Sequence, residues 1–109
     1  MEQFYQGSTF SYAGSFPMID DTGQPVSAAD VAVTAAIRFK RHGQSASLNV
    51  SHSVAGPSNS IVDVLAEALD SVTAAWPTGE AEIQFRFQFG SGHVVKTGKD
   101  QIMILEAVL

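Results

Sequence analysis

The sequence predicts an all-β protein, an antiparallel β-sandwich of about seven strands with a minor short helix. The first observation is the segment 81–89, in which apolar and polar residues alternate without a break. Because a strand turns successive side chains to opposite faces, this segment buries one aromatic face and exposes the other to solvent. The second observation is that turn-forming residues divide the remaining chain into short apolar segments. An open barrel would give nearly the same pattern.

The first elements are expected between residues 8 and 25. Residues 8–13 predict a strand with Phe10 and Tyr12 on one face, and Gly14 and Ser15 are expected to break it. A second strand over 16–19 should lead into a turn over 20–25, which is rich in Asp, Gly and Pro.

The next elements are expected to form a hairpin. Residues 31–41 alternate cleanly, and the turn over 42–44 leads to a strand with Ala46, Leu48 and Val50 on one face. A loop should follow over 55–59. The inward residues of the first of these two strands are Val31, Val33, Ala35, Ile37 and Phe39.

Residues 60–76 combine helical spacing with β-branched residues, so we expect a strand over 60–66 and a short helical segment over 67–75. Strands over 80–89, 93–97 and 101–109 complete the chain.

The last strand is apolar on both faces over residues 102–109. Two interpretations remain open, a docking element that meets a partner and a central strand buried on both sides.

Length and charge narrow the possible functions. A chain of 109 residues predicts one domain over 1–109. The net charge of −5 argues against nucleic acid as a partner, and the one basic cluster, Arg38, Lys40 and Arg41, is expected to be a solvated strand end. The absence of cysteine excludes disulfides. No apolar run is long enough to span a membrane, and the first residues lack a signal-peptide pattern, so we expect synthesis in the cytoplasm.

Asp21, Thr22 and Gly23 match the Asp-Thr-Gly sequence that dimeric aspartic proteases use to bring two carboxylates together. That chemistry needs a buried aspartate, whereas here Asp20 precedes it and Gln24 follows. We therefore interpret the segment as a turn and keep the protease as a remote alternative.

The other candidate groups are scattered along the chain. His42, His52 and His93 lack the spacing of a zinc site, and the segment 90–92 lacks the lysine of a phosphate loop. Trp76 could stack on a ligand, but a lone tryptophan at the start of a strand more often plugs the end of a sandwich. We therefore expect no catalytic, cofactor-binding or metal-binding residue.

Several short segments, in order along nearly the whole chain, resemble a family of phage tail and baseplate proteins. The family has a Gly-x-Thr-Phe strand, an acidic-Gly turn, a strand ending in Ile-Arg, a Thr-x-x-Trp-Pro-x-Gly corner and a Gly-x-Val-x-Thr strand. The matching segments here are 6–10, 20–26, 36–38, 73–79 and 92–97. One departure is Glu82-Ile83, where the family frequently has Asp-Ile.

The family resembled includes the N-terminal immunoglobulin-like domain of the upper baseplate protein that carries receptor-binding modules. This resemblance implies an immunoglobulin-like sandwich that works without catalysis, through docking to other phage structural proteins and to copies of itself. Such baseplate proteins continue beyond this domain, whereas the sequence here ends at Leu109. We therefore expect the sandwich alone, as a phage or prophage virion component assembled in the host cytoplasm. The alternative is a stand-alone module that binds a ligand or carbohydrate.

Overall fold

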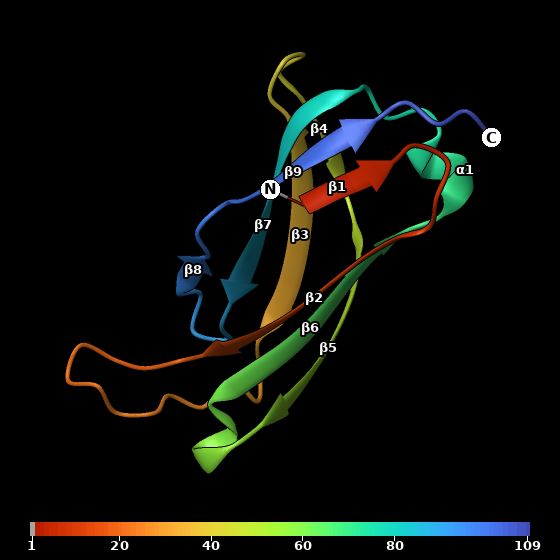
Figure 1. The fold of residues 1–109 in the computed structure, drawn as a ribbon. Helices are drawn as coiled ribbons and strands as arrows, with labels where there is room; N and C mark the ends of the chain where they lie inside the picture. The colour runs from red at the N-terminus through yellow and green to blue at the C-terminus, as the bar shows by residue number, and fades with distance from the viewer. Residues whose placement is uncertain (1) are drawn as a thin grey trace.

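A computed structural model describes residues 2–109, which form strands, one 3-10 turn and one short helix (Figure 1). In chain order the elements are β1 (Glu2–Tyr5), β2 (Phe10–Pro17), β3 (Ala32–Phe39), β4 (Gln44–Ser47), β5 (Asn49–Ala55), η1 (Pro57–Asn59), β6 (Ile61–Ala68), α1 (Asp70–Thr73), β7 (Gly79–Gln88), β8 (Val94–Lys96) and β9 (Asp100–Leu105).

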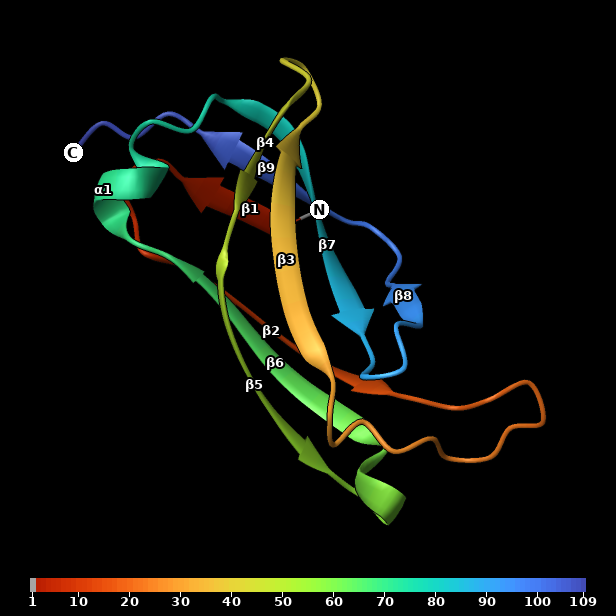
Figure 2. The ribbon, with the colours of Figure 1, turned by 180° about the vertical axis from the view of Figure 1, so that it is seen from behind.

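The strands form two sheets that lie against each other, as the two opposite views in Figures 1 and 2 show. One sheet has the order β1-β9-β7-β3-β4, with β8 paired to β7, and the other has the order β2-β6-β5. In immunoglobulin notation β2, β6 and β5 are strands B, E and D, and β9, β7 and β3 are strands G, F and C. The predicted immunoglobulin-like β-sandwich is confirmed.

Two details of the architecture differ from the expectation. The described chain has nine strands where about seven were predicted. In addition, β1 pairs with β9 in parallel, so the larger sheet is mixed, although its other pairings are antiparallel. No strand was expected at β1, because an alternation over only four residues is too short to distinguish a strand from a loop.

The core is the aromatic face of β7, as the alternation predicted. Phe85 and Phe87 are 2% and 0% exposed. Rings from the opposite sheet cover them: Phe16 lies 5.5 Å from Phe85 and 5.4 Å from Phe87 between ring centroids, and Tyr12 lies 5.9 Å from Phe85. Such aromatic pairs add stability beyond the area that they bury.

Trp76 closes one end of the sandwich, as predicted for a tryptophan before a strand. Its ring is 4% exposed and is surrounded by Phe4, Phe10 and Phe39 at centroid distances of 5.8, 5.4 and 5.7 Å. The side chain of Gln6 donates a hydrogen bond to the Trp76 carbonyl, which connects the start of the chain to this corner.

The predicted break at Gly14 and Ser15 is wrong, because β2 runs through both residues in register with β6. Gly14 is inward-facing, opposite Val64. A Cβ atom at this position would lie 2.8 Å from the ring of Phe16. The glycine therefore makes room for a core ring and does not end the strand.

The single strand predicted through Ala46, Leu48 and Val50 is also wrong. The chain changes sheets at Leu48, so β4 belongs to the larger sheet and β5 to the smaller one. The Leu48 amide donates to the Ala35 carbonyl at 3.0 Å, and its side chain is buried. Alternation continues through the crossover, so the sequence pattern does not reveal it. The loop predicted over 55–59 contains η1.

A strand followed by a helix was predicted for the region after residue 60, and the structure contains both as β6 and α1. The helix has only four residues. The hydroxyl of Thr73 donates to the Ser8 carbonyl at 2.6 Å, which connects α1 to the segment before β2.

The last strand is internal, which is the second of the two interpretations considered. β9 pairs with β1 on one side and β7 on the other, so its backbone is not free for docking. It ends at Leu105, and residues 106–109 lie outside any strand, with Val108 98% exposed.

The sealed core predicts a large effect of Phe87→Ala. Removing a fully buried ring should lower the free energy of unfolding by about 3–5 kcal/mol, measured by chemical denaturation. Phe89→Ala, at the half-buried end of the same stripe, is the matched control and should cost clearly less. Equal small losses for both variants would contradict the packing described here.

Candidate functional site

The three histidines stay apart in the fold. His42 lies in the turn between β3 and β4, His52 on β5, and His93 in the turn between β7 and β8. Within residues 2–109, no group of three or more His, Asp or Glu side chains is arranged to hold a metal ion.

The Asp-Thr-Gly segment forms a closed, exposed turn. The carboxylate of Asp20 accepts hydrogen bonds from the Thr22 amide at 2.9 Å, the Thr22 hydroxyl at 2.6 Å and the Gln24 amide at 3.0 Å. Gly23 adopts φ 81°, which favours glycine, and its amide donates to the Asp20 carbonyl. Asp21 is exposed. The proteolytic arrangement needs a buried carboxylate, so the local structure here is that of a turn.

These hydrogen bonds change the acidity of Asp20. The Thr22 hydroxyl, followed by the Gln24 and Thr22 amides, donates to the ionised carboxylate, and this holds the pKa of Asp20 below its ordinary value of 3.8. The hydrogen bonds therefore keep this carboxylate negatively charged to a lower pH than an ordinary aspartate.

A hollow lies where this turn meets the β7–β8 turn. Its volume is about 380 Å³, within the range of small-ligand sites. The ring of His93 lies 6.1 Å from that of Phe89, between centroids, at one side of it. The complete lining is Pro17, Met18, Ile19, Asp20, Asp21, Val26, Phe89, His93 and Val95.

This hollow, which we call the end cavity, combines an apolar wall with two carboxyl groups and one imidazole. The sequence pattern does not reveal this cavity, because its residues come from two turns far apart in the chain. The available signal was Phe89, where the apolar alternation continues one residue beyond the end of β7. Such a lining can bind a small ligand with an apolar body and a polar or cationic group.

A second polar region lies on the outer face of the larger sheet, where side chains of β3 and β7 point away from the core. The Nζ of Lys99 lies 3.6 Å from an Oε of Glu82, and the Nζ of Lys40 lies 3.7 Å from an Oε of Glu80. Gln101 connects the two pairs, since it accepts from Lys40 and donates to Glu82, both at 3.2 Å.

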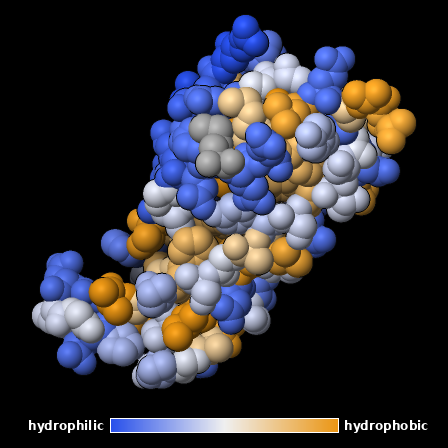
Figure 3. All heavy atoms as spheres, viewed as in Figure 1, coloured by the Kyte–Doolittle hydropathy of each residue, from blue (hydrophilic) through white to orange (hydrophobic). Residues whose placement is uncertain are grey.

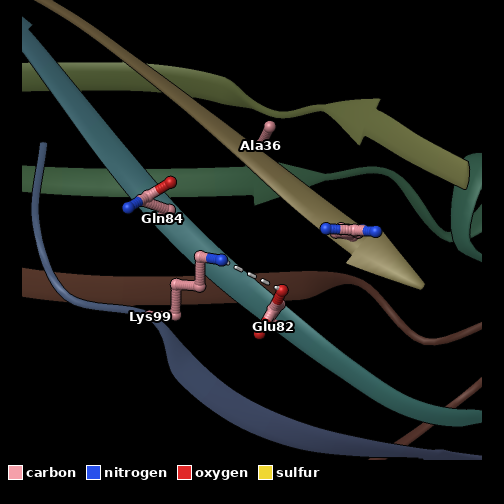
Figure 4. Close-up of a pocket in the computed structure, with 5 residues that line it drawn as sticks. Ala36, Glu82, Gln84 and Lys99 are labelled. Atoms are coloured by element: carbon pink, nitrogen blue, oxygen red, sulfur yellow. Dashed lines mark ion pairs between the residues drawn. The ribbon is translucent and has the colours of Figure 1, made fainter. Parts of the chain in front are cut away.

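A shallow hollow of about 150 Å³ lies beside these pairs, and Figure 4 shows the Lys99–Glu82 ion pair at its edge. Its lining is Ala36, Arg38, Glu82, Gln84 and Lys99. The hydrogen bond from Gln101 and the positive charges of Lys99, Lys40 and Arg38 lower the pKa of Glu82 from its ordinary value of 4.5. The expected basic cluster at the end of β3 is exposed, as predicted.

Comparison with known proteins gives no relative: no protein-family model and no curated protein matches the chain. No helix within residues 2–109 has the length and apolar character needed to cross a membrane.

The Asp20 turn predicts a measurable effect of Thr22→Val. The variant removes the hydroxyl donor, so the pKa of Asp20 should rise toward 3.8, measured by carboxyl-carbon NMR titration. Because the folded-state pKa is depressed, the contribution of Asp20 to stability is present above its ordinary pKa and is lost as the pH falls through the lowered value. The loss of stability that Asp20 causes as the pH falls should be smaller in Thr22→Val than in the wild type. The exposed Thr78→Val should leave the titration unchanged, and an unaltered Asp20 pKa in Thr22→Val would refute this explanation.

Proposed function

We propose that this chain is a non-enzymatic structural or accessory protein of a phage or prophage virion, of the tail or baseplate type. It works by protein–protein docking and self-association. The observation that carries the docking role is the free edge of β5.

β5 is one of the two outermost strands of the smaller sheet, and it pairs with β6 over seven residue pairs without a bulge. An outermost strand offers unpaired N–H and C=O groups to a strand of another molecule. Natural proteins that stay apart protect such edges with charged residues, proline or bulges. β5 contains no Lys, Arg, Asp, Glu or Pro. It is therefore suited to strand addition.

The phage assignment is supported by the family resemblance together with the immunoglobulin-like topology. The segments that carry the resemblance fall at structural positions with clear roles. Gly7 adopts φ 77° in the turn before β2, and Trp76 forms the corner before β7. This agreement supports a domain of that kind.

The end cavity favours a second candidate function, a stand-alone module that binds a ligand or carbohydrate. Phe89 offers a ring for stacking, and His93, Asp20 and Asp21 offer polar groups. A ligand bound there should shift the NMR signals of Phe89 and His93. No feature of the Asp21 turn favours the protease.

The proposed function predicts where the chain is found in its source cell. After prophage induction, an antibody against the chain should detect it with tailed particles that sediment in a density gradient. If the chain stays entirely in the fraction without particles, the proposed function is wrong.

The β5 edge predicts a specific defect in His52→Lys. His52 lies opposite Val64 on the core side of the edge strand, although its own side chain is exposed. A charge on an edge strand opposes pairing with another strand, so the particle-bound fraction should fall about tenfold or more. His42→Lys, which makes the same change in an exposed turn, should leave incorporation unchanged. Both variants should unfold at similar denaturant concentrations. Equal incorporation of the two variants would exclude β5 as the docking edge.

A further inference from the structure

The charged residues of this acidic protein are sorted between its two sheets. All six Lys and Arg residues lie on strands of the larger sheet or in the turns that join them. β2, β5 and β6 of the smaller sheet contain none, and the exposed carboxylates there are Asp63 and Glu67. The two sheets therefore present outer faces of opposite charge at neutral pH.

We refer to the outward side chains of β3, β7 and β8, with Lys99, as the cationic face. Its two carboxylates, Glu80 and Glu82, are already paired with lysines. Within residues 2–109, no carboxylate forms an ion pair with Arg38, Arg86 or Lys96. Arg38 lies opposite Glu82, and its charge acts on that carboxylate without an ion pair, whereas Arg86 and Lys96 carry their positive charges into solvent.

The cationic face has two shallow hollows with small residues at their centre. The first is the hollow beside Arg38 and Lys99, and the second, of about 240 Å³, has Arg86 and Lys96 at its side. Ala36 and Gln84 line both. The first hollow also has the carboxylate of Glu82 in its lining, paired with Lys99, so that Arg38 is its remaining cation. The second hollow has two cations and no acid in its lining, and both hollows can therefore receive a carboxylate.

The outward side of the smaller sheet, which we call the anionic face, carries the complementary charge. Asp63 lies in register between two serines, Ser15 on β2 and Ser53 on β5. Glu67 lies between Ser11 and Asn49, and Leu65 is placed between the two carboxylates. Because their neighbours are short, both carboxylates project above the surface.

The spacing of the charges also matches. Asp63 and Glu67 are four residues apart on one face of a strand, which is about 13 Å. On the cationic face, Arg86 of β7 lies opposite Thr34 of β3. Thr34 is four residues from Arg38 along β3, so the two arginines are also separated by about 13 Å along the strand direction. Leu65 would then face the floor at Ala36.

We propose that the anionic face of one copy docks on the cationic face of a second copy, with Asp63 and Glu67 seated in the two hollows. This inference rests on the proposed self-association and names its surfaces.

The two contacting surfaces differ, so the contact is heterologous. Every copy keeps one free cationic face and one free anionic face, and copies therefore stack into open rows or closed rings. Val94 on β8 is the large exposed apolar side chain of the cationic face, and four others lie near α1 and the chain end. Figure 3 shows orange spheres at the upper right, near α1 and the chain end in Figure 1. The exposed apolar residues of these segments are Leu69, Val72, Val108 and Leu109.

Sedimentation velocity across protein and salt concentration tests this proposal on four proteins. The wild type should self-associate at low salt and dissociate as salt screens the charges. Arg38→Glu with Arg86→Glu reverses one face, and Asp63→Lys with Glu67→Lys reverses the other. Each double variant should lose association by about 100-fold or more, because like charges then meet. Asp70→Lys with Glu106→Lys is the control, which changes the same charge away from both faces and should keep association.

The decisive step is to mix the two face-reversed variants in equal amounts. Each carries two faces of one sign, so neither should associate alone, whereas the mixture should form alternating oligomers. A monomeric wild type at low salt, or association that survives both double reversals, overturns the proposal. A wild type that stays monomeric but binds poly-glutamate through Arg38 and Arg86 would assign the cationic face to a foreign acidic partner. If the chain nevertheless sediments with particles, only the stacking is wrong, and the proposed function stands.

Discussion

The fold depends on one requirement, that the rings of β7 be covered from the opposite sheet. β7 lies between β3 and β9, and its inward residues are buried along the whole strand. Phe16 and Tyr12 on β2 provide the cover. Each buried aromatic ring contributes on the order of 2 kcal/mol or more through removal from water. A Cβ atom at position 14 would collide with the ring of Phe16, which covers Phe85 and Phe87, and this explains why the strand has a glycine there.

The interior satisfies this requirement without constraining the two outer faces. Outward residues on β3 and β7 alternate with the core residues, so their charge can vary while the packing stays the same. One face carries ion pairs and surplus arginine, and the other carries two isolated carboxylates among serines. In an assembly protein such faces can act through shape and charge, and the proposed stacking uses both.

The sequence predicted the parts of the fold that depend on local alternation. β3 and β7, with their inward residues, were predicted correctly because each strand has one buried face and one face exposed to solvent. Trp76 was also placed correctly, at the end of the sandwich. The crossover at Leu48 was missed because the alternation continues through a change of sheet. The role of Gly14 was missed because it depends on the position of Phe16, which no local pattern shows.

The functional surfaces were less predictable than the fold for the same reason. The end cavity joins two turns far apart in the chain, and the hollow beside Arg86 and Lys96 needs the register of four strands. Periodicity predicted that Arg38 faces solvent, but only the pairing of strands reveals that its charge and that of Asp63 lie on opposite sheets.

Native-state amide hydrogen exchange tests the central claim most directly. If the covered rings of β7 hold the two sheets together, the amides of residues 83–87 should exchange only when the whole molecule unfolds. Their opening free energy should then equal that of global unfolding. Exchange of these amides through a local opening, at rates similar to those of the edge strand β5, would contradict the account.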